Sequence, residues 1–150
     1  MTFGKGAAVI GAVAAAGVAA LVLWTTAPTG DHEQTKAAGG GTEGAAIVTV
    51  RVPAQFSPLA RTGKAAFEAK CAACHGKNAS GIEGKGPPLV HKYYHPGHHG
   101  DAAFFQAAHN GVRSHHWRFG DMPPVEGLTD ADIKAIVRYV RELQKENGIF

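Results

Sequence analysis

Cysteine and methionine are scarce in this sequence, with two of each among 150 residues. A scaffold held by several disulfides is therefore excluded, and a structural zinc site lacks the second cysteine pair that it commonly needs. The excess of positive charge is small, because the formal net charge is +3, and the basic residues are scattered along the chain. Nucleic-acid binding is therefore not expected. The sequence has no internal repeat and no glycine-rich phosphate-binding motif.

The N-terminal segment is the longest stretch without charge. No charged residue occurs between Lys5 and Asp31, and the apolar run is just long enough for a spanning helix, which needs roughly 20 residues. We predict a signal anchor over residues 1–27, in the inner (cytoplasmic) membrane, with the rest of the chain on the periplasmic side. The alternative is a signal peptide cleaved after Ala27, which would leave a soluble periplasmic protein, although Pro28 disfavours that cut.

Residues 28–54 have the composition of a flexible tether, because glycine and small polar residues dominate and few residues are able to build a core. Alternating valines within this range predict a short extended segment at residues 47–53. The folded domain is predicted over residues 55–150.

This domain is predicted to be all-α, with three or more helices joined by long loops. Ser57 is the expected cap of the first helix, which Gly76 ends. Asp101 is predicted to cap a second helix within residues 101–111, and a capping-box pair opens a third within residues 128–148. A domain of about 95 residues with so much loop buries little core of its own. We therefore expect the chain to fold around a large apolar group.

Both cysteines lie in the segment CAACH. Such a pair serves in a disulfide, in half of a zinc site, in a thiol redox centre or in covalent haem attachment. A disulfide between helical residues three apart is strained, zinc lacks a second ligand pair, and a thioredoxin-like centre needs a βαβ unit that the pattern does not contain. Haem attachment explains the most features, since Cys71 and Cys74 would bond the two vinyl groups and His75 would be the proximal iron ligand.

Two proline-rich turns predict the partner of the His75 ring and the second iron ligand. In GPPL, the carbonyl of Pro87 is the predicted acceptor for the second ring nitrogen of His75. In GDMPP, Met122 is the only thioether beyond the N-terminus, and the following prolines stiffen its backbone. Met122 is therefore the predicted distal ligand. Its rivals are three upstream histidines, His109, His115 and His116.

Over about residues 57–148 the chain resembles a class I c-type cytochrome. CAACH is highly specific, and GPPL, GDMPP and the final helix IVRYVREL occur in the order of that family. The resemblance implies helices wrapped around one covalently attached haem c, with the first and last helices crossing at Gly63, Phe67 and Tyr139. It also implies a one-electron carrier rather than an enzyme, with redox proteins as partners. For a membrane-tethered member these are a quinol-oxidising complex and a terminal oxidase or other reductase.

Seven histidines lie between positions 91 and 116, more than an electron carrier requires. One interpretation places them in solvated loops, with one or two bonding the haem propionates beside Arg113, Trp117 or a tyrosine. The other is a second metal site for copper or zinc, which imidazole suits. Its candidate ligands are His95, His98, His99, His115 and His116.

Two further functions therefore remain open. One is a haem enzyme or gas-binding protein with a displaceable distal ligand, in which His115 or His116 performs acid–base chemistry. The other is a metal-handling module in which the histidine loops bind copper.

Overall fold

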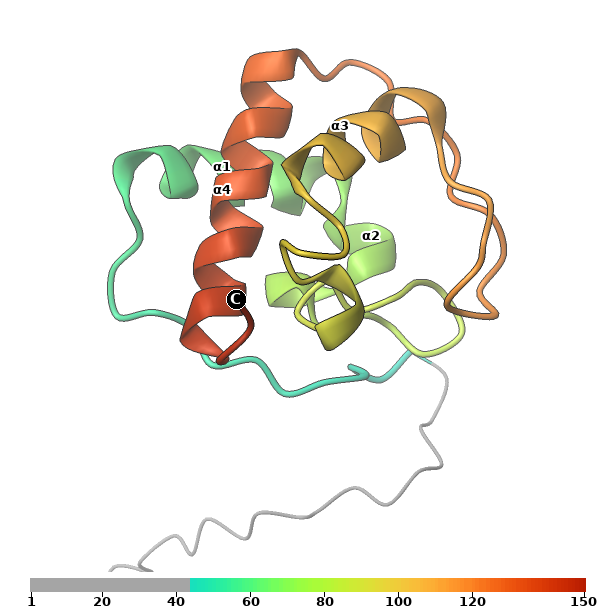
Figure 1. Ribbon diagram of the computed structural model, residues 1–150, viewed down its shortest axis with the longest axis horizontal. Helices are drawn as coiled ribbons and strands as arrows, with labels where there is room; N and C mark the ends of the chain where they lie inside the picture. Colours follow the sequence, from blue (N-terminus) through green and yellow to red (C-terminus); the bar gives the residue numbers. More distant parts are fainter. Residues whose placement is uncertain (1–43) are drawn as a thin grey trace, which may run out of the picture. The chain divides into compact units, whose positions relative to one another are not determined.

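Helices are the only continuous regular structure in residues 44–150, the part of the chain that the computed structural model describes (Figure 1). This part contains no strand, in agreement with the predicted all-α class. The predicted signal anchor and the tether up to residue 43 lie outside the described residues. The elements are α1 (Pro58–Lys70), α2 (Ala72–His75), the 3₁₀ turns η1 (Lys77–Ala79) and η2 (Lys92–Tyr94), α3 (Asp101–Asn110) and α4 (Asp130–Glu146).

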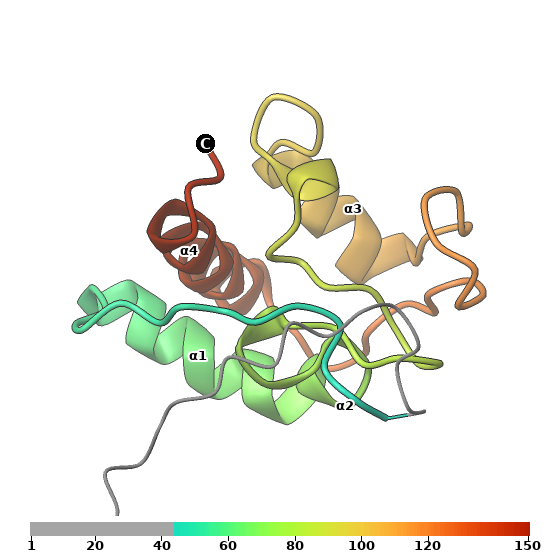
Figure 2. The ribbon, with the colours of Figure 1, turned by 90° about the horizontal axis from the view of Figure 1, so that it is seen from below.

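The crossing of α1 and α4 is the main packing contact of the domain, and the two helices lie against each other in both ribbon views (Figure 1 and Figure 2). Gly63 of α1 is buried at this crossing, and a Cβ placed on it would overlap the carbonyl of Ala135 in α4. Only glycine permits two backbones to approach this closely. α3 packs on α4 through a separate small cluster of Ala108, Ile133 and Val137.

Aromatic rings fill the space beside the crossing. Phe67 of α1 and Tyr139 of α4 are fully buried, with ring centroids 5.5 Å apart. Phe56 lies 5.2 Å from Tyr139 on another side. The Tyr139 hydroxyl donates to Oδ1 of Asn78 at 3.1 Å, so its polar end has a partner.

The helix starts agree with the sequence at two of three positions. The Ser57 side chain accepts a hydrogen bond from the amide of Ala60 at the start of α1. Thr129 and Asp132 form a complete capping box at the start of α4, with bonds in both directions, so the predicted capping box is confirmed.

Two details differ from the predictions. Asp101 is the first residue of α3 and makes no cap; Gly100 is the N-cap, and the Asp101 carboxylate pairs with Arg141 at 2.8 Å instead. The predicted first helix is divided at Cys71, whose φ of −117° lies far from the usual helical value of about −63°. The second half is the short helix α2, which ends at Gly76 as expected, because that residue adopts a positive φ.

The residues before the expected domain start also make specific contacts. The amide of Val48 donates to the Ser80 carbonyl at 3.1 Å, and Arg51 exchanges main-chain hydrogen bonds with the Asn147 side chain. Residues 47–53, predicted to be extended, form a bend at residues 47 and 48 and have no regular structure over residues 49–53, so they do not pair as a strand. Among the helices of residues 44–150, none combines the length and the apolar composition needed to cross a membrane.

α4 also holds the loop that precedes α3. The Arg141 guanidinium donates to the main-chain carbonyls of Tyr94 and His99, and the amide of Gln144 donates to those of Leu89 and Tyr94. Gln144 is almost fully buried. These bonds satisfy loop carbonyls and fix a histidine-rich segment against the helix.

Candidate functional site

A cavity of about 690 Å³ opens between the helices and the loop of residues 111–128. This volume lies within the range of roughly 300–1,000 Å³ that is typical of cofactor pockets. Its walls are mainly apolar, with Phe67, Leu89, Phe104 and Ile136 among the lining residues. A cavity of this size in so small a domain agrees with the expectation that the chain folds around an apolar group.

Cys71 and Cys74 line this cavity, and they are not bonded to each other. Burial, followed by the nearby Cys74, raises the pKa of Cys71 to about 11. A thiol redox centre needs the opposite shift, toward a stable thiolate. Within residues 44–150, no group of three or more metal-ligating side chains includes either cysteine. The surroundings therefore argue against a redox dithiol and against zinc.

His75 follows the cysteines at the end of α2 and is buried beside the same cavity. Its Nδ1 lies 2.9 Å from the carbonyl oxygen of Pro87. Burial lowers the pKa of His75, and the hydrogen bond to Pro87 opposes that shift in part. An Nδ1–H that donates to a carbonyl leaves Nε2 unprotonated, which is the form of histidine that binds a metal.

Gly86 brings the Pro87 carbonyl to this position, and the sequence analysis did not single it out. The amide of Ile82 donates to the Gly86 carbonyl, which closes the turn before GPPL. A Cβ on Gly86 would lie 2.7 Å from the carbonyl oxygen of Cys74. The turn thus packs directly on the cysteine motif, and the glycine at the start of GPPL was the available signal.

Met122 lines the cavity from the loop that follows α3. Its amide and its carbonyl each bond to Val112 at 2.9 Å, and these two bonds fix the backbone on both sides of the residue. His115 and His116 line the cavity as well. His109 does not, and it pairs with Asp130 at 2.8 Å on the surface.

Trp117 and Tyr94 also line the cavity. The indole Nε1 of Trp117 is buried and has no hydrogen-bond partner of acceptable geometry. Burial raises the pKa of Tyr94, and a hydrogen-bonding contact with the Trp117 side chain lowers it by less. Arg113 is exposed and does not line the cavity, so its contact to a propionate stays a prediction. A tyrosine was expected beside the propionates, but nothing in the sequence separates Tyr94 from Tyr93.

The indole N–H of Trp117 bears on whether a haem fits this cavity, because a buried donor without an acceptor is costly and a bound group could supply the acceptor. A haem carries carboxylates at one edge and vinyl groups at the other, and this cavity offers a buried donor and two thiols for them. The apolar walls suit the porphyrin face. The residues present therefore fit a covalently attached haem.

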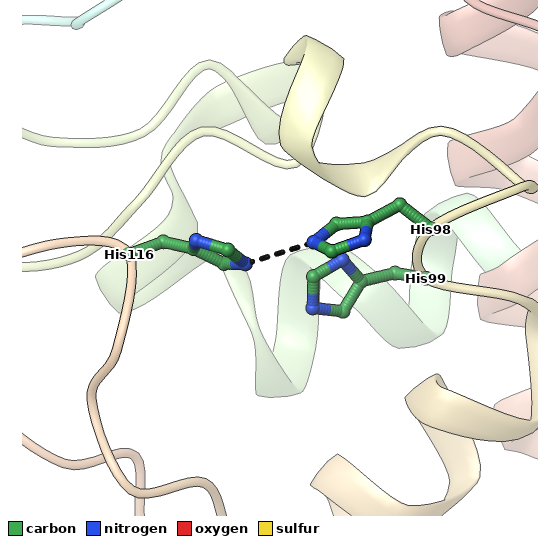
Figure 3. A group of neighbouring side chains, drawn as sticks. All are labelled: His98, His99 and His116. Carbon is green, nitrogen blue, oxygen red and sulfur yellow. Dashed lines mark hydrogen bonds between the residues drawn. The ribbon is translucent and has the colours of Figure 1, made fainter.

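Three of the five histidines predicted for a second metal site come together: His98, His99 and His116 (Figure 3). We call these three the histidine triad. Loss of hydration and then repulsion from neighbouring imidazoles lower the pKa of His116. The pKa of His99 is also lowered, mainly by burial. His95 and His115 lie outside the triad, although the His115 ring centroid is 4.2 Å from that of His116.

The cavity, the paired cysteines and the adjacent histidine define a class of protein that holds haem through thioether bonds. The sequence model of the Cytochrome c family matches residues 60–144, more than half of the chain, and the chain belongs to that family. No curated protein and no solved structure gives a significant match. Family membership supports haem c binding and haem-based electron transfer in general.

Proposed function

We propose that this protein is a class I cytochrome c that carries one electron on a single haem, with His75 and Met122 as axial ligands. The observation that carries the proposal is the convergence of both side chains, together with Cys71 and Cys74, on one cavity. The chain contains one CAACH segment, which supports a single haem.

Met122 is a better candidate than the rival histidines because its backbone is fixed. The reciprocal bonds with Val112 hold Met122 directly, whereas His115 and His116 lie inside the loop that these bonds close and have no main-chain pairing of their own. Both histidines also have other partners. Nδ1 of His115 lies 2.9 Å from the carbonyl oxygen of Arg113, and Nε2 of His116 lies 3.2 Å from Nε2 of His98.

When bound, haem supplies reversible one-electron exchange between ferric and ferrous iron, and a Met/His pair raises its potential relative to two histidines. The residues of the chain orient the ligands of the haem and shield it from water. Pro87 holds the His75 ring through Nδ1. The indole N–H of Trp117 is available to donate to a propionate, beside the Tyr94 hydroxyl. The apolar walls exclude water, which keeps the energy of reorganisation on electron transfer small.

The proposed location is the periplasmic face of the inner membrane, with residues 1–27 as an uncleaved anchor; cleavage would give a soluble periplasmic carrier. The uncharged run after Lys5 supports this location. Its proposed partners are a quinol-oxidising complex and a terminal oxidase or other reductase.

A second candidate function is a haem enzyme or gas-binding protein. It is favoured by one observation, that His115 and His116 line the haem cavity and offer acid–base groups there. Such a protein requires an open or displaceable distal position.

The spectrum of the ferric protein tests the axial ligands. The wild type is expected to show the weak charge-transfer band of a methionine–iron bond, and Met122→Ala is expected to lose it. His115→Ala and His116→Ala serve as matched controls that keep the band. A band that survives in Met122→Ala would refute methionine ligation, and ready binding of carbon monoxide to the reduced wild type would favour the second candidate.

A further inference from the structure

We propose that the histidine triad is a second metal site, which binds one divalent transition-metal ion at the mouth of the haem cavity, with copper(II) bound most tightly. Its ligands are His98, His99 and His116. One ring nitrogen from each residue lies within 4.8 Å of the other two, and the three rings converge from two separate loops (Figure 3). His99 and His116 also line the haem cavity, whereas His98 does not.

The spacing of the nitrogens fits metal coordination. Nε2 of His98 and Nε2 of His116 are 3.2 Å apart. With bonds of about 2.0–2.1 Å, two nitrogens on one ion are about 3.3 Å apart in the tetrahedral geometry of zinc(II) and about 2.9 Å apart in adjacent positions of the tetragonal geometry of copper(II). The observed separation lies between these values. One edge of the coordination polyhedron is therefore already formed. The third nitrogen, that of the half-buried His99, needs to approach by on the order of 1 Å, which a small side-chain rotation achieves.

Tyr93 orients two of the three ligands. Its carbonyl oxygen lies 2.6 Å from Nδ1 of His99, and a ligand histidine commonly donates its second N–H to such a carbonyl. This bond leaves Nε2 of His99 as the free metal-binding atom. The Tyr93 ring stacks on the His116 ring, with centroids 4.8 Å apart and planes 23° from parallel. These two contacts of Tyr93 fix the orientation of the rings, which is not expected of histidines in a solvated loop.

The backbones of both loops are held as well. Arg141 of α4 donates to the carbonyl of His99, and the amides of His98 and His99 both bond to the carbonyl of His95. In the other loop, the amide of Ser114 donates to Asp121 at 2.8 Å. The triad therefore resembles a preorganised site, for which little ordering entropy remains to be lost on binding.

The ligand set selects the metal. Three neutral imidazoles without thiolate or carboxylate suit copper(II) and zinc(II), and copper(II) is the stronger binder in the usual order of divalent ions. Three protein ligands leave a fourth position for water or an external ligand, as in open sites. Arg141 lies close to His99, and its positive charge repels that of the metal; it lowers the affinity without removing a ligand.

The test uses the haem-loaded full chain after treatment with a chelator. Equilibrium dialysis against copper(II) and, separately, zinc(II) measures the stoichiometry and the affinity. His98→Ala is the critical variant because His98 is exposed and lies outside the haem cavity. His109→Ala is the matched control, because His109 is an exposed histidine in the last turn of α3 with no place in the triad.

The wild type is expected to bind one copper(II) per chain. His98→Ala should weaken binding by about 100-fold, since it removes a ligand and not merely a supporting residue, whereas His109→Ala should leave it unchanged. Electron paramagnetic resonance of the bound copper should show nitrogen coupling that decreases in His98→Ala. Unchanged affinity in His98→Ala, an equal loss in His109→Ala, or no stoichiometric binding would each overturn the proposal. The haem spectrum, recorded on the same samples, verifies that each variant is folded.

Discussion

Replacement of Gly63 by alanine sets two known effects against each other. In an exposed helix interior the exchange is stabilising by about 1 kcal/mol, because alanine is the better helix former. At Gly63 the new Cβ would overlap the carbonyl carbon and oxygen of Ala135 and lie 2.8 Å from the amide nitrogen of Ile136. All three atoms belong to the backbone, so no side-chain rotation relieves the clash.

The helices must therefore separate, and overpacking of this kind costs about 1–3 kcal/mol. We place the cost at or above the upper end, because α1 and α4 form the main packing contact and the buried rings of Phe67 and Tyr139 sit beside the crossing. After subtraction of the gain in helix propensity, the expected net loss is about 2 kcal/mol. For a domain of this size, that loss lowers the melting temperature by about 8–16 °C.

Urea unfolding of the haem-loaded protein, followed by far-ultraviolet circular dichroism, measures the change. Ala65→Gly is the matched control, because Ala65 is exposed in the same helix. Its substitution should cost about 1 kcal/mol through propensity alone. If Gly63→Ala is as stable as the wild type or more stable, while Ala65→Gly shows its expected loss, the close crossing of α1 and α4 is refuted.

Three further predictions concern α4 and the triad. Gln144→Leu leaves the Leu89 carbonyl without its donor, whereas the Tyr94 carbonyl keeps its bond from Arg141. The variant should destabilise the protein by about 2 kcal/mol in urea unfolding; an unchanged midpoint would contradict this. Burial raises the pKa of Glu142, but hydrogen bonds from Ser57 and pairing with Arg138 lower it overall. The ionised Glu142 therefore stabilises the folded state fully above pH 4.5, the usual pKa of a glutamate, and this stabilisation is lost as the pH falls through the lowered pKa. The stability gap between wild type and Glu142→Gln, measured against pH, should close on acidification, and a constant gap would contradict it. Zinc bound to the triad should raise the haem potential by roughly tens of millivolts, since a nearby dication favours ferrous iron; redox titration should show no zinc effect in His98→Ala.

Local signals in the sequence were sufficient to name most of the predicted haem ligands that the structure brings to one cavity. CAACH and GPPL each fix their residues within a few positions of the chain, and the second turn packs on the first through Gly86. The cap at Thr129 could also be predicted from the sequence, because a capping box involves only neighbouring residues. Predictions of this kind need no knowledge of how distant segments meet.

The remaining features depend on contacts between distant segments. Asp101 has the sequence of a helix cap, yet it pairs with Arg141, 40 residues away. His98 and His116 are 18 residues apart in separate loops, and no periodicity relates them. The orphaned indole of Trp117 becomes visible only when the cavity around it is defined. In each case tertiary packing, and not local propensity, decides the outcome.

α4 links the two sites. Ile136 on one face lines the haem cavity, while Arg141 and Gln144 on the same helix bond the carbonyls of the loop that carries His98 and His99. The position of that loop is therefore set by the same helix that closes the cavity against α1. A displacement of α4 would alter the cavity wall and the triad together, whereas loss of a triad imidazole removes no contact of α4 itself. Variants in α4 should thus affect both sites, and variants at His98 only one. This asymmetry makes the exposed histidine the cleaner probe of metal binding.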